Sequence, residues 1–102
     1  MVGLVNEYLK GQNLEQLGRV DEAVALYEHS VEAGFDSPGP YDRLIEIYSS
    51  RSMHLEVVRV AAAAQKAVHT HGDKLRWYES MAEAAKKAAT KVPTAAPKRP
   101  AE

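Results

Sequence analysis

The stretch GQNLEQLGRVDEAVALYEHSVEA, from Gly11 to Ala33, decides the fold of this chain. Its first apolar residues recur at the spacing of a helix, and Gly18 interrupts that spacing. Asp21 follows the interruption, where a carboxylate can accept backbone N–H groups at the start of a second helix. The stretch therefore predicts two helices joined by a tight turn.

Helical spacing continues on both sides of this unit. A loop is expected before Pro40, because Pro38 and Gly39 do not continue a helix, and Gly34 can supply the left-handed residue that ends the preceding one. The predicted fold is all-α, with antiparallel helix-turn-helix repeats and a disordered C-terminal tail. The helices are expected at residues 4–17, 21–33, 40–48, 55–68 and 74–89.

The predicted core consists of the apolar stripes of these helices. Residues expected to be buried between the hairpins are Leu44, Tyr48, Val58 and Ala61. The first and last helices are expected to use the stripes Leu4, Val5, Tyr8, Leu9, Leu14, Leu17 and Leu75, Tyr78, Met81, Ala82, Ala85, Ala89.

Charge is distributed unevenly along the 102 residues, although the net charge is only −1. Residues 1–85 contain 8 Lys and Arg against 13 Asp and Glu, whereas residues 86–102 contain five bases and Glu102 alone. Residues 91–102 combine basic side chains with three prolines, so they are predicted to form a disordered basic tail. No leader or long apolar run is recognised, and a cytoplasmic location is expected.

The residues with reactive side chains do not form a recognisable catalytic motif. The chain has no cysteine, which excludes disulfides and thiolate chemistry, and it has no glycine-rich phosphate loop. His69 and His71 could supply only two ligands to a metal, which needs three or four. We therefore expect neither an enzyme nor a bound metal or cofactor.

The two helical hairpins repeat at a constant offset along the sequence. At this offset the second hairpin aligns with the first through the pairs Gly11 and Ile45, Leu14 and Tyr48, Gly18 and Ser52, Tyr27 and Ala61. The offset matches the repeat length of about 34 residues that is typical of the paired helices in tetratricopeptide repeats.

The chain resembles the tetratricopeptide repeat (TPR) family over residues 4–89. The resemblance is carried by the segment from Gly18 to Ala23, by the small residue Gly11, and by the aromatic residue Tyr27. It implies a domain over residues 1–90, with repeats at 4–37 and 38–71 and a capping helix at 73–90. The second repeat departs from the family pattern, with Ile45, Ser52 and Ala61 in place of a small residue, a glycine and an aromatic.

The resemblance also implies a concave groove, lined by the first helix of each repeat, that binds a peptide or a protein segment. Because acids outnumber bases in this groove, a basic or neutral partner is expected, with Tyr8 or Trp77 as an aromatic anchor. The groove residues implied by the resemblance are Tyr8, Gln12, Glu15, Asp42, Arg43, Glu46, Asp73, Arg76, Trp77 and Ser80.

Two other functions remain open at this point. The array is short, so its ends could stack on other copies in a homo-oligomeric structural protein. RNA binding occurs in other helical-hairpin repeats, but the acidic body of this chain opposes it, because RNA binding requires clustered Lys and Arg. We therefore expect a non-enzymatic scaffold or adaptor that binds protein and neither nucleic acid nor membrane.

Overall fold

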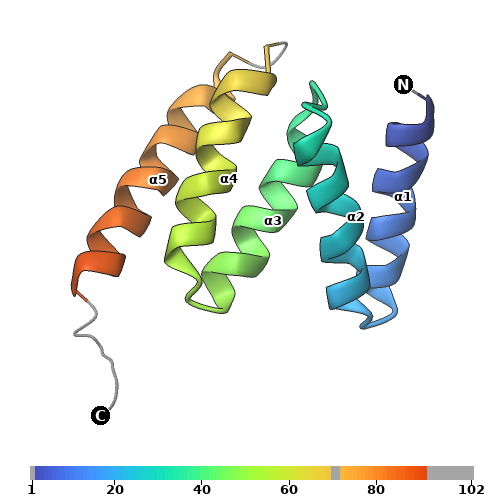
Figure 1. Cartoon of the computed structure of the whole chain (residues 1–102), viewed down its shortest axis with the longest axis horizontal. Coiled ribbons are helices and arrows are strands. Elements are labelled where there is room, and N and C mark those ends of the chain that lie inside the picture. Colours follow the sequence, from blue (N-terminus) through green and yellow to red (C-terminus); the bar gives the residue numbers. More distant parts are fainter. Residues whose placement is uncertain (1, 70–71, 92–102) are drawn as a thin grey trace.

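The computed structural model of the chain describes residues 2–69 and 72–91, and these residues form five helices and no strand (Figure 1). The predicted all-α fold is therefore confirmed, whereas the predicted disordered tail at 92–102 and the capping role of His71 lie outside the described residues. Lys91, placed in the tail by the prediction, is the last residue of a helix. The helices are α1 (Val2–Gln16), α2 (Val20–Glu32), α3 (Pro38–Ser50), α4 (His54–Ala67) and α5 (Lys74–Lys91).

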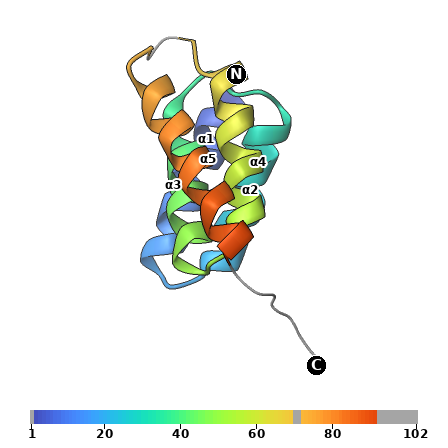
Figure 2. The ribbon, with the colours of Figure 1, turned by 90° about the vertical axis from the view of Figure 1, so that its left-hand side faces the viewer.

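The helices follow one another across the molecule in chain order, and consecutive helices are antiparallel (Figure 1). In the view turned by 90°, α1 and α3 lie on one side, α2 and α4 lie on the other, and α5 begins on the side of α1 and α3 (Figure 2). The molecule is elongated, with extents of 47 × 31 × 19 Å. Each helix packs mainly against its neighbours in the chain, as expected for stacked hairpins.

The turns of the two hairpins have the same backbone structure. Gly18 and Ser52, which occupy equivalent positions in the two hairpins, both adopt a left-handed conformation, with φ of 80° and 57°. In each turn the N–H groups of the left-handed residue and of the residue after it donate hydrogen bonds to carbonyl groups in the last turn of the preceding helix. These bonds satisfy carbonyl groups that would otherwise lack a partner at the end of the helix. The equivalent hydrogen bonds are Gly18 N–H to Glu15 O and Ser52 N–H to Ser49 O, then Arg19 N–H to Leu14 O and Met53 N–H to Tyr48 O.

The core contains the residues predicted for the central helices. Leu44, Tyr48 and Ala61 are buried, and Val58 is partly buried against them. Ile47 and Val60 are also buried, although neither lies on a predicted stripe. They are buried because α3 and α4 have neighbours on more than one side, so more than a single stripe of each helix faces protein.

The apolar stripes predicted for α1 and α5 are wrong at four positions. Val5, Leu9, Leu17 and Leu75 have exposed fractions of 44%, 49%, 69% and 36%. These helices lie at the two ends of the array (Figure 1), so each contacts protein through a narrower face than α3 does. Helical spacing alone does not show whether a helix lies at the centre or at an end of the array.

Asp21 does not cap α2 as predicted. The helix begins one residue earlier, at Val20, and Arg19 occupies the N-cap position without a side-chain cap hydrogen bond. Asp21 instead lies in the first turn of α2 and pairs with Arg51, whose Nη2 is 2.9 Å from its Oδ1. The carboxylate therefore connects the two hairpin turns rather than closing its own helix.

Candidate functional site

The predicted groove residues lie on α1, α3 and the beginning of α5, which we call the α1/α3/α5 surface. Tyr8, Gln12 and Glu15 are on α1, Asp42, Arg43 and Glu46 are on α3, and Asp73, Arg76, Trp77 and Ser80 are at or near the start of α5. Glu46, Asp73, Arg76 and Ser80 are exposed. The other six make hydrogen-bond or cation–π contacts with residues of the same or a neighbouring helix; they are Tyr8, Gln12, Glu15, Asp42, Arg43 and Trp77.

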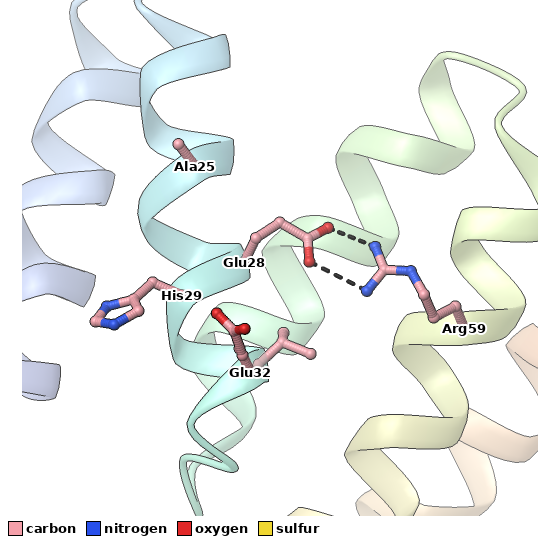
Figure 3. Close-up of a pocket in the computed structure, with 6 residues that line it drawn as sticks. Ala25, Glu28, His29, Glu32 and Arg59 are labelled. Carbon is pink, nitrogen blue, oxygen red and sulfur yellow. Dashed lines mark hydrogen bonds and ion pairs between the residues drawn. The ribbon is translucent and has the colours of Figure 1, made fainter.

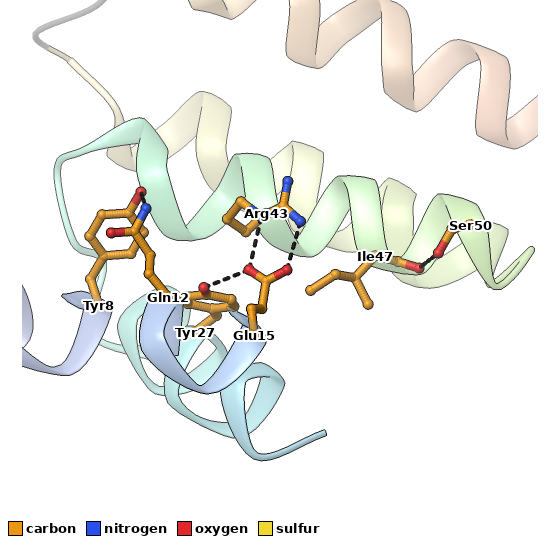
Figure 4. Close-up of polar contacts among 7 residues, drawn as sticks. All are labelled: Tyr8, Gln12, Glu15, Tyr27, Arg43, Ile47 and Ser50. Atoms are coloured by element: carbon orange, nitrogen blue, oxygen red, sulfur yellow. Dashed lines mark hydrogen bonds and ion pairs between the residues drawn. The ribbon is translucent and has the colours of Figure 1, made fainter. Parts of the chain in front are cut away.

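Glu15 connects three helices (Figure 4). Its two carboxylate oxygens accept hydrogen bonds from Arg43 on α3, at 2.9 Å from Nε and 2.7 Å from Nη2. The hydroxyl of Tyr27 on α2 donates to the same carboxylate at 2.7 Å. The Arg43 hydrogen bonds lower the pKa of Glu15, while burial, followed by the bond to Glu15, raises the pKa of Tyr27.

Tyr8 is fixed in the contact between α1 and α3. Its hydroxyl accepts a hydrogen bond from Gln12 Nε2 at 2.9 Å (Figure 4), and its ring centroid lies 6.0 Å from that of Tyr27. A Cβ atom at Gly39 would lie 2.5 Å from Cζ of Tyr8, so the start of α3 packs directly on this ring. Tyr8 therefore packs between α1 and α3, and less of its ring is available to a ligand than expected for an aromatic anchor.

Asp42 connects α3 to α5. It accepts a hydrogen bond from the hydroxyl of Tyr78 at 2.8 Å, and Lys74 Nζ lies 3.0 Å from its second oxygen. The same Nζ is 4.2 Å from the ring centroid of Trp77, which is within cation–π range. Burial, and after it the hydrogen bond to Asp42, raises the pKa of Tyr78.

The charge of the surface is less negative than the groove residues alone predict. Glu15 and Asp42 are each paired with a cation, and Lys74 adds a positive charge that sequence reasoning did not place there. Lys74 could have been found, because it precedes Tyr78 by four residues and shares its side of a helix.

Two cavities, one on the α1/α3/α5 surface and one between α3, α4 and α5, differ in chemistry. One, of about 300 Å³, lies between α1 and α3 and has a polar lining that includes Gln12, Gln16 and Arg43. The other, of about 200 Å³, is almost entirely apolar and lies where α3 and α4 meet α5. Sequence reasoning did not predict this apolar cavity, which is lined by Ser49, His54, Val57, Met81, Ala84, Ala85 and Ala88.

The opposite side of the molecule has a larger cavity, of about 460 Å³, between α2 and α4 (Figure 3). Arg59 on α4 reaches across it to Glu28 on α2, with contacts of 2.6 and 3.1 Å. Tyr48 on α3 also donates to Glu28, and burial raises the pKa of that tyrosine. The carboxylate therefore receives a tyrosine hydroxyl and a cation, as Glu15 and Asp42 do.

Among residues 2–69 and 72–91, no group of three or more His, Cys, Asp or Glu side chains could hold a metal ion. Within the same residues, no helix combines the length and the apolar character that crossing a membrane requires. Comparison of the chain with protein-family models, with curated proteins and with solved structures finds no match.

Proposed function

We propose that the chain is a non-enzymatic protein-binding module of the tetratricopeptide type, which acts in the cytoplasm as a scaffold or adaptor. The observation that carries this proposal is the recurrence of the same hairpin turn at Gly18 and at Ser52, the positions that the sequence repeat makes equivalent. Hairpins that repeat in this way place α1, α3 and α5 in succession, and stacked helices of this kind offer an extended surface to a second protein.

The chemistry of this surface defines the ligand class. The amides of Gln12 and Gln16 can hydrogen-bond the backbone of an extended segment, beside the exposed edge of Arg43. The apolar cavity next to Met81 and Ala84 can hold one aliphatic side chain of the same segment. Exposed Glu46 disfavours acidic segments.

The proposal can be tested with peptides selected from a random library on the immobilised chain. Selected peptides are titrated into isotopically labelled protein, and shifts are expected for Gln12, Gln16 and Ala84 but not for Ala25 of α2. Ala84→Phe should fill the apolar cavity and weaken binding about tenfold, a change of about 1.4 kcal/mol. Lys87→Phe is the matched control, because Lys87 is exposed on the same helix and does not line the cavity.

Charge preference is tested with the selected peptides at low and moderate salt. Basic or neutral peptides should bind better than acidic ones, and Glu46→Lys should reduce that difference. Acidic peptides that bind at least as well, or shifts confined to α2 and α4, would contradict the proposal.

A further inference from the structure

The apolar cavity between α3, α4 and α5 lies close to the last described residue of the chain. Ala84, Ala85 and Ala88 of α5 line it, and Ala88 precedes Lys91, the end of α5, by three residues. Eleven residues follow Lys91, and a fully extended segment of that length spans about 36 Å. The cavity is therefore well within reach of residues 92–102.

The sequence after Lys91 favours an end to α5 and a change of direction. Pro93 has no N–H group for a helical hydrogen bond, and it disfavours a helical conformation of Val92. Small, mostly apolar residues come next, and two bases follow them; in order they are Thr94, Ala95, Ala96, Pro97, Lys98 and Arg99.

An exposed acid lies one helical turn from the cavity on α3. Asp42 and Ser49 mark the side of α3 that faces α5, since Asp42 accepts a hydrogen bond from Tyr78 and Ser49 lines the cavity. Glu46 lies between them on the same side, at the i, i+4, i+7 spacing of a helix. Within the part of the chain that the structure describes, Glu46 forms no ion pair. It is therefore available to a base.

The distance back to the cavity fits the spacing of small residues after Lys91. Ala85 lies about 9 Å from Lys91 along α5, at 1.5 Å per residue. An extended chain rises about 3.3 Å per residue, so three residues cover this distance. When the chain turns at residues 92–93 and runs back along α5, Ala95 and Ala96 reach the cavity.

The same spacing brings a base to Glu46. Glu46 precedes Ser49 by three residues, so it lies about 4.5 Å farther from the end of α3. One or two more extended residues cover this distance, which brings Lys98 to the carboxylate. We infer that residues 94–99 fold back along the junction of α3 and α5, with Ala95 and Ala96 over the cavity and Lys98 paired with Glu46.

This contact would compete with a peptide ligand, a consequence that rests on the proposed function because the ligand is proposed to use the same cavity. Alanine side chains fill only part of a cavity of about 200 Å³, so a peptide with a larger aliphatic side chain makes more contacts there. Attachment to α5 favours the segment, since a short flexible linker gives an effective concentration in the millimolar range. The segment therefore lowers the affinity for peptides without preventing their binding.

Paramagnetic broadening of NMR signals tests the contact in the full chain, with no peptide present. The chain has no cysteine, so Ala101→Cys places a single nitroxide label just beyond the inferred contact. The amide signals of Glu46 and Ala84 should lose at least half of their intensity, whereas that of Ala25, which lines the cavity on the opposite side, should keep it. A mixture of nitroxide-labelled chain and isotopically labelled chain should show no such loss, because the contact lies within one molecule.

Exchange of charge tests the pairing of Lys98 with Glu46. In the nitroxide-labelled chain, Lys98→Glu and Glu46→Lys should each restore most of the lost intensity, and the double variant should lose it again. Lys10→Glu is the control, because it changes the net charge equally at an exposed position of α1 and should leave the broadening as it was. Unbroadened signals in the unmodified sequence, broadening that persists in Lys98→Glu, a double variant that stays unbroadened, or an equal loss in the mixture would each overturn the inference.

Competition is measured separately, with neutral peptides among those selected from the library. Lys98→Glu should tighten their binding at least about twofold, because apparent affinity falls with the fraction of molecules whose cavity is occupied. Lys10→Glu should leave their affinity unchanged, and equal affinities for all three chains would overturn the competition. Broadening without any peptide binding would contradict the proposed function alone, whereas peptide binding without broadening would contradict this contact alone.

Discussion

In the α1–α2 hairpin the ring of Tyr27 lies against Gly11, whereas the equivalent positions of the α3–α4 hairpin are Ile45 and Ala61. A Cβ atom added to Gly11 would lie only 2.6 Å from Cε1 of Tyr27, so the first helix has no room for a side chain there. In the second hairpin the large residue is on the first helix and the small one is on the second, and both are fully buried. One backbone therefore accepts opposite distributions of side-chain volume, as long as each pair fills the space between its helices.

The hairpins also differ at their turns and in their surroundings. Gly18 adopts a left-handed conformation without strain, whereas Ser52 adopts the same conformation with a side chain. The α3–α4 hairpin has neighbours on both sides, while α1 ends the array (Figure 1). These differences predict that equivalent substitutions will have unequal effects in the two hairpins.

The largest effect is expected in the central hairpin. Leu44→Ala leaves a cavity at a fully buried position, so it should lower the free energy of unfolding by about 2–5 kcal/mol. Leu17→Ala, at a position that is 69% exposed in the turn after α1, should change it by less than about 0.5 kcal/mol. Chemical denaturation measures both, and similar losses for the two variants would mean that the central hairpin is not the core of the array.

The close packing of Gly11 against the Tyr27 ring is tested by substituting the glycine. Gly11→Ala should lower the free energy of unfolding by about 1–3 kcal/mol, because its methyl group would press on the Tyr27 ring. The loss should be smaller when it is measured in a Tyr27→Ala background, where the ring is absent.

Gly3→Ala is the control, because it changes the same residue type in the same helix. A Cβ atom there meets no other atom within 4 Å, so this variant should be neutral or stabilised by up to about 1 kcal/mol. If the cost of Gly11→Ala is the same with and without the Tyr27 ring, the packing explanation is wrong.

A smaller effect of the opposite sign is expected at the second turn. Ser52→Gly should raise the free energy of unfolding by up to about 1 kcal/mol, since glycine accepts the left-handed conformation more easily than serine. Gly18→Ala, in the first turn, should lower it by a similar amount without a clash, because no atom lies within 4 Å of its added Cβ. Thermal unfolding compares the two, and a lower midpoint for Ser52→Gly would show that the serine side chain stabilises its turn.

The smallest effect depends on pH and is confined to the first hairpin. The hydrogen bond to Glu7 raises the pKa of His29 above 6.5, because the carboxylate favours the protonated imidazole. A raised pKa in the folded state stabilises the hairpin below the unfolded pKa, and this contribution is lost as the pH rises through the folded pKa. An NMR titration of His29 should show the raised value and its return in Glu7→Gln. An unchanged pKa in that variant would mean that Glu7 is not the cause.

The helical spacing of apolar residues predicted most of the residues that fill the centre of this fold, but it missed Ile47 and Val60. The spacing of Leu44, Ile45 and Tyr48 predicts one buried side of α3, and all three are buried. The exposure of Leu9 and Leu17 could not be predicted from spacing, because it depends on which helix ends the array. Exposed apolar residues in a predicted terminal repeat should therefore be assigned to the core only when the neighbouring helix is known.

The predicted groove residues lie on the expected helices, but the contacts that they make with one another could not be predicted from the sequence. Glu15 and Arg43 are 28 positions apart, and their contact depends on how closely α1 approaches α3. The resemblance to the TPR family implied that both are groove residues. It could not show that they neutralise one another.

Three carboxylates that accept hydrogen bonds from tyrosine hydroxyls affect how the molecule unfolds. Glu15 and Asp42 each connect one hairpin to the next element of the array, and Glu28 connects α2 to both helices of the following hairpin. In a repeat array, unfolding is cooperative when the interfaces between units contribute much of the stability. Neutral solution should therefore favour concerted unfolding of the helices. At Glu15, where the Arg43 hydrogen bonds lower the pKa, acid removes this contribution as the pH falls through the folded pKa, so the first hairpin should then lose its protection from hydrogen exchange separately.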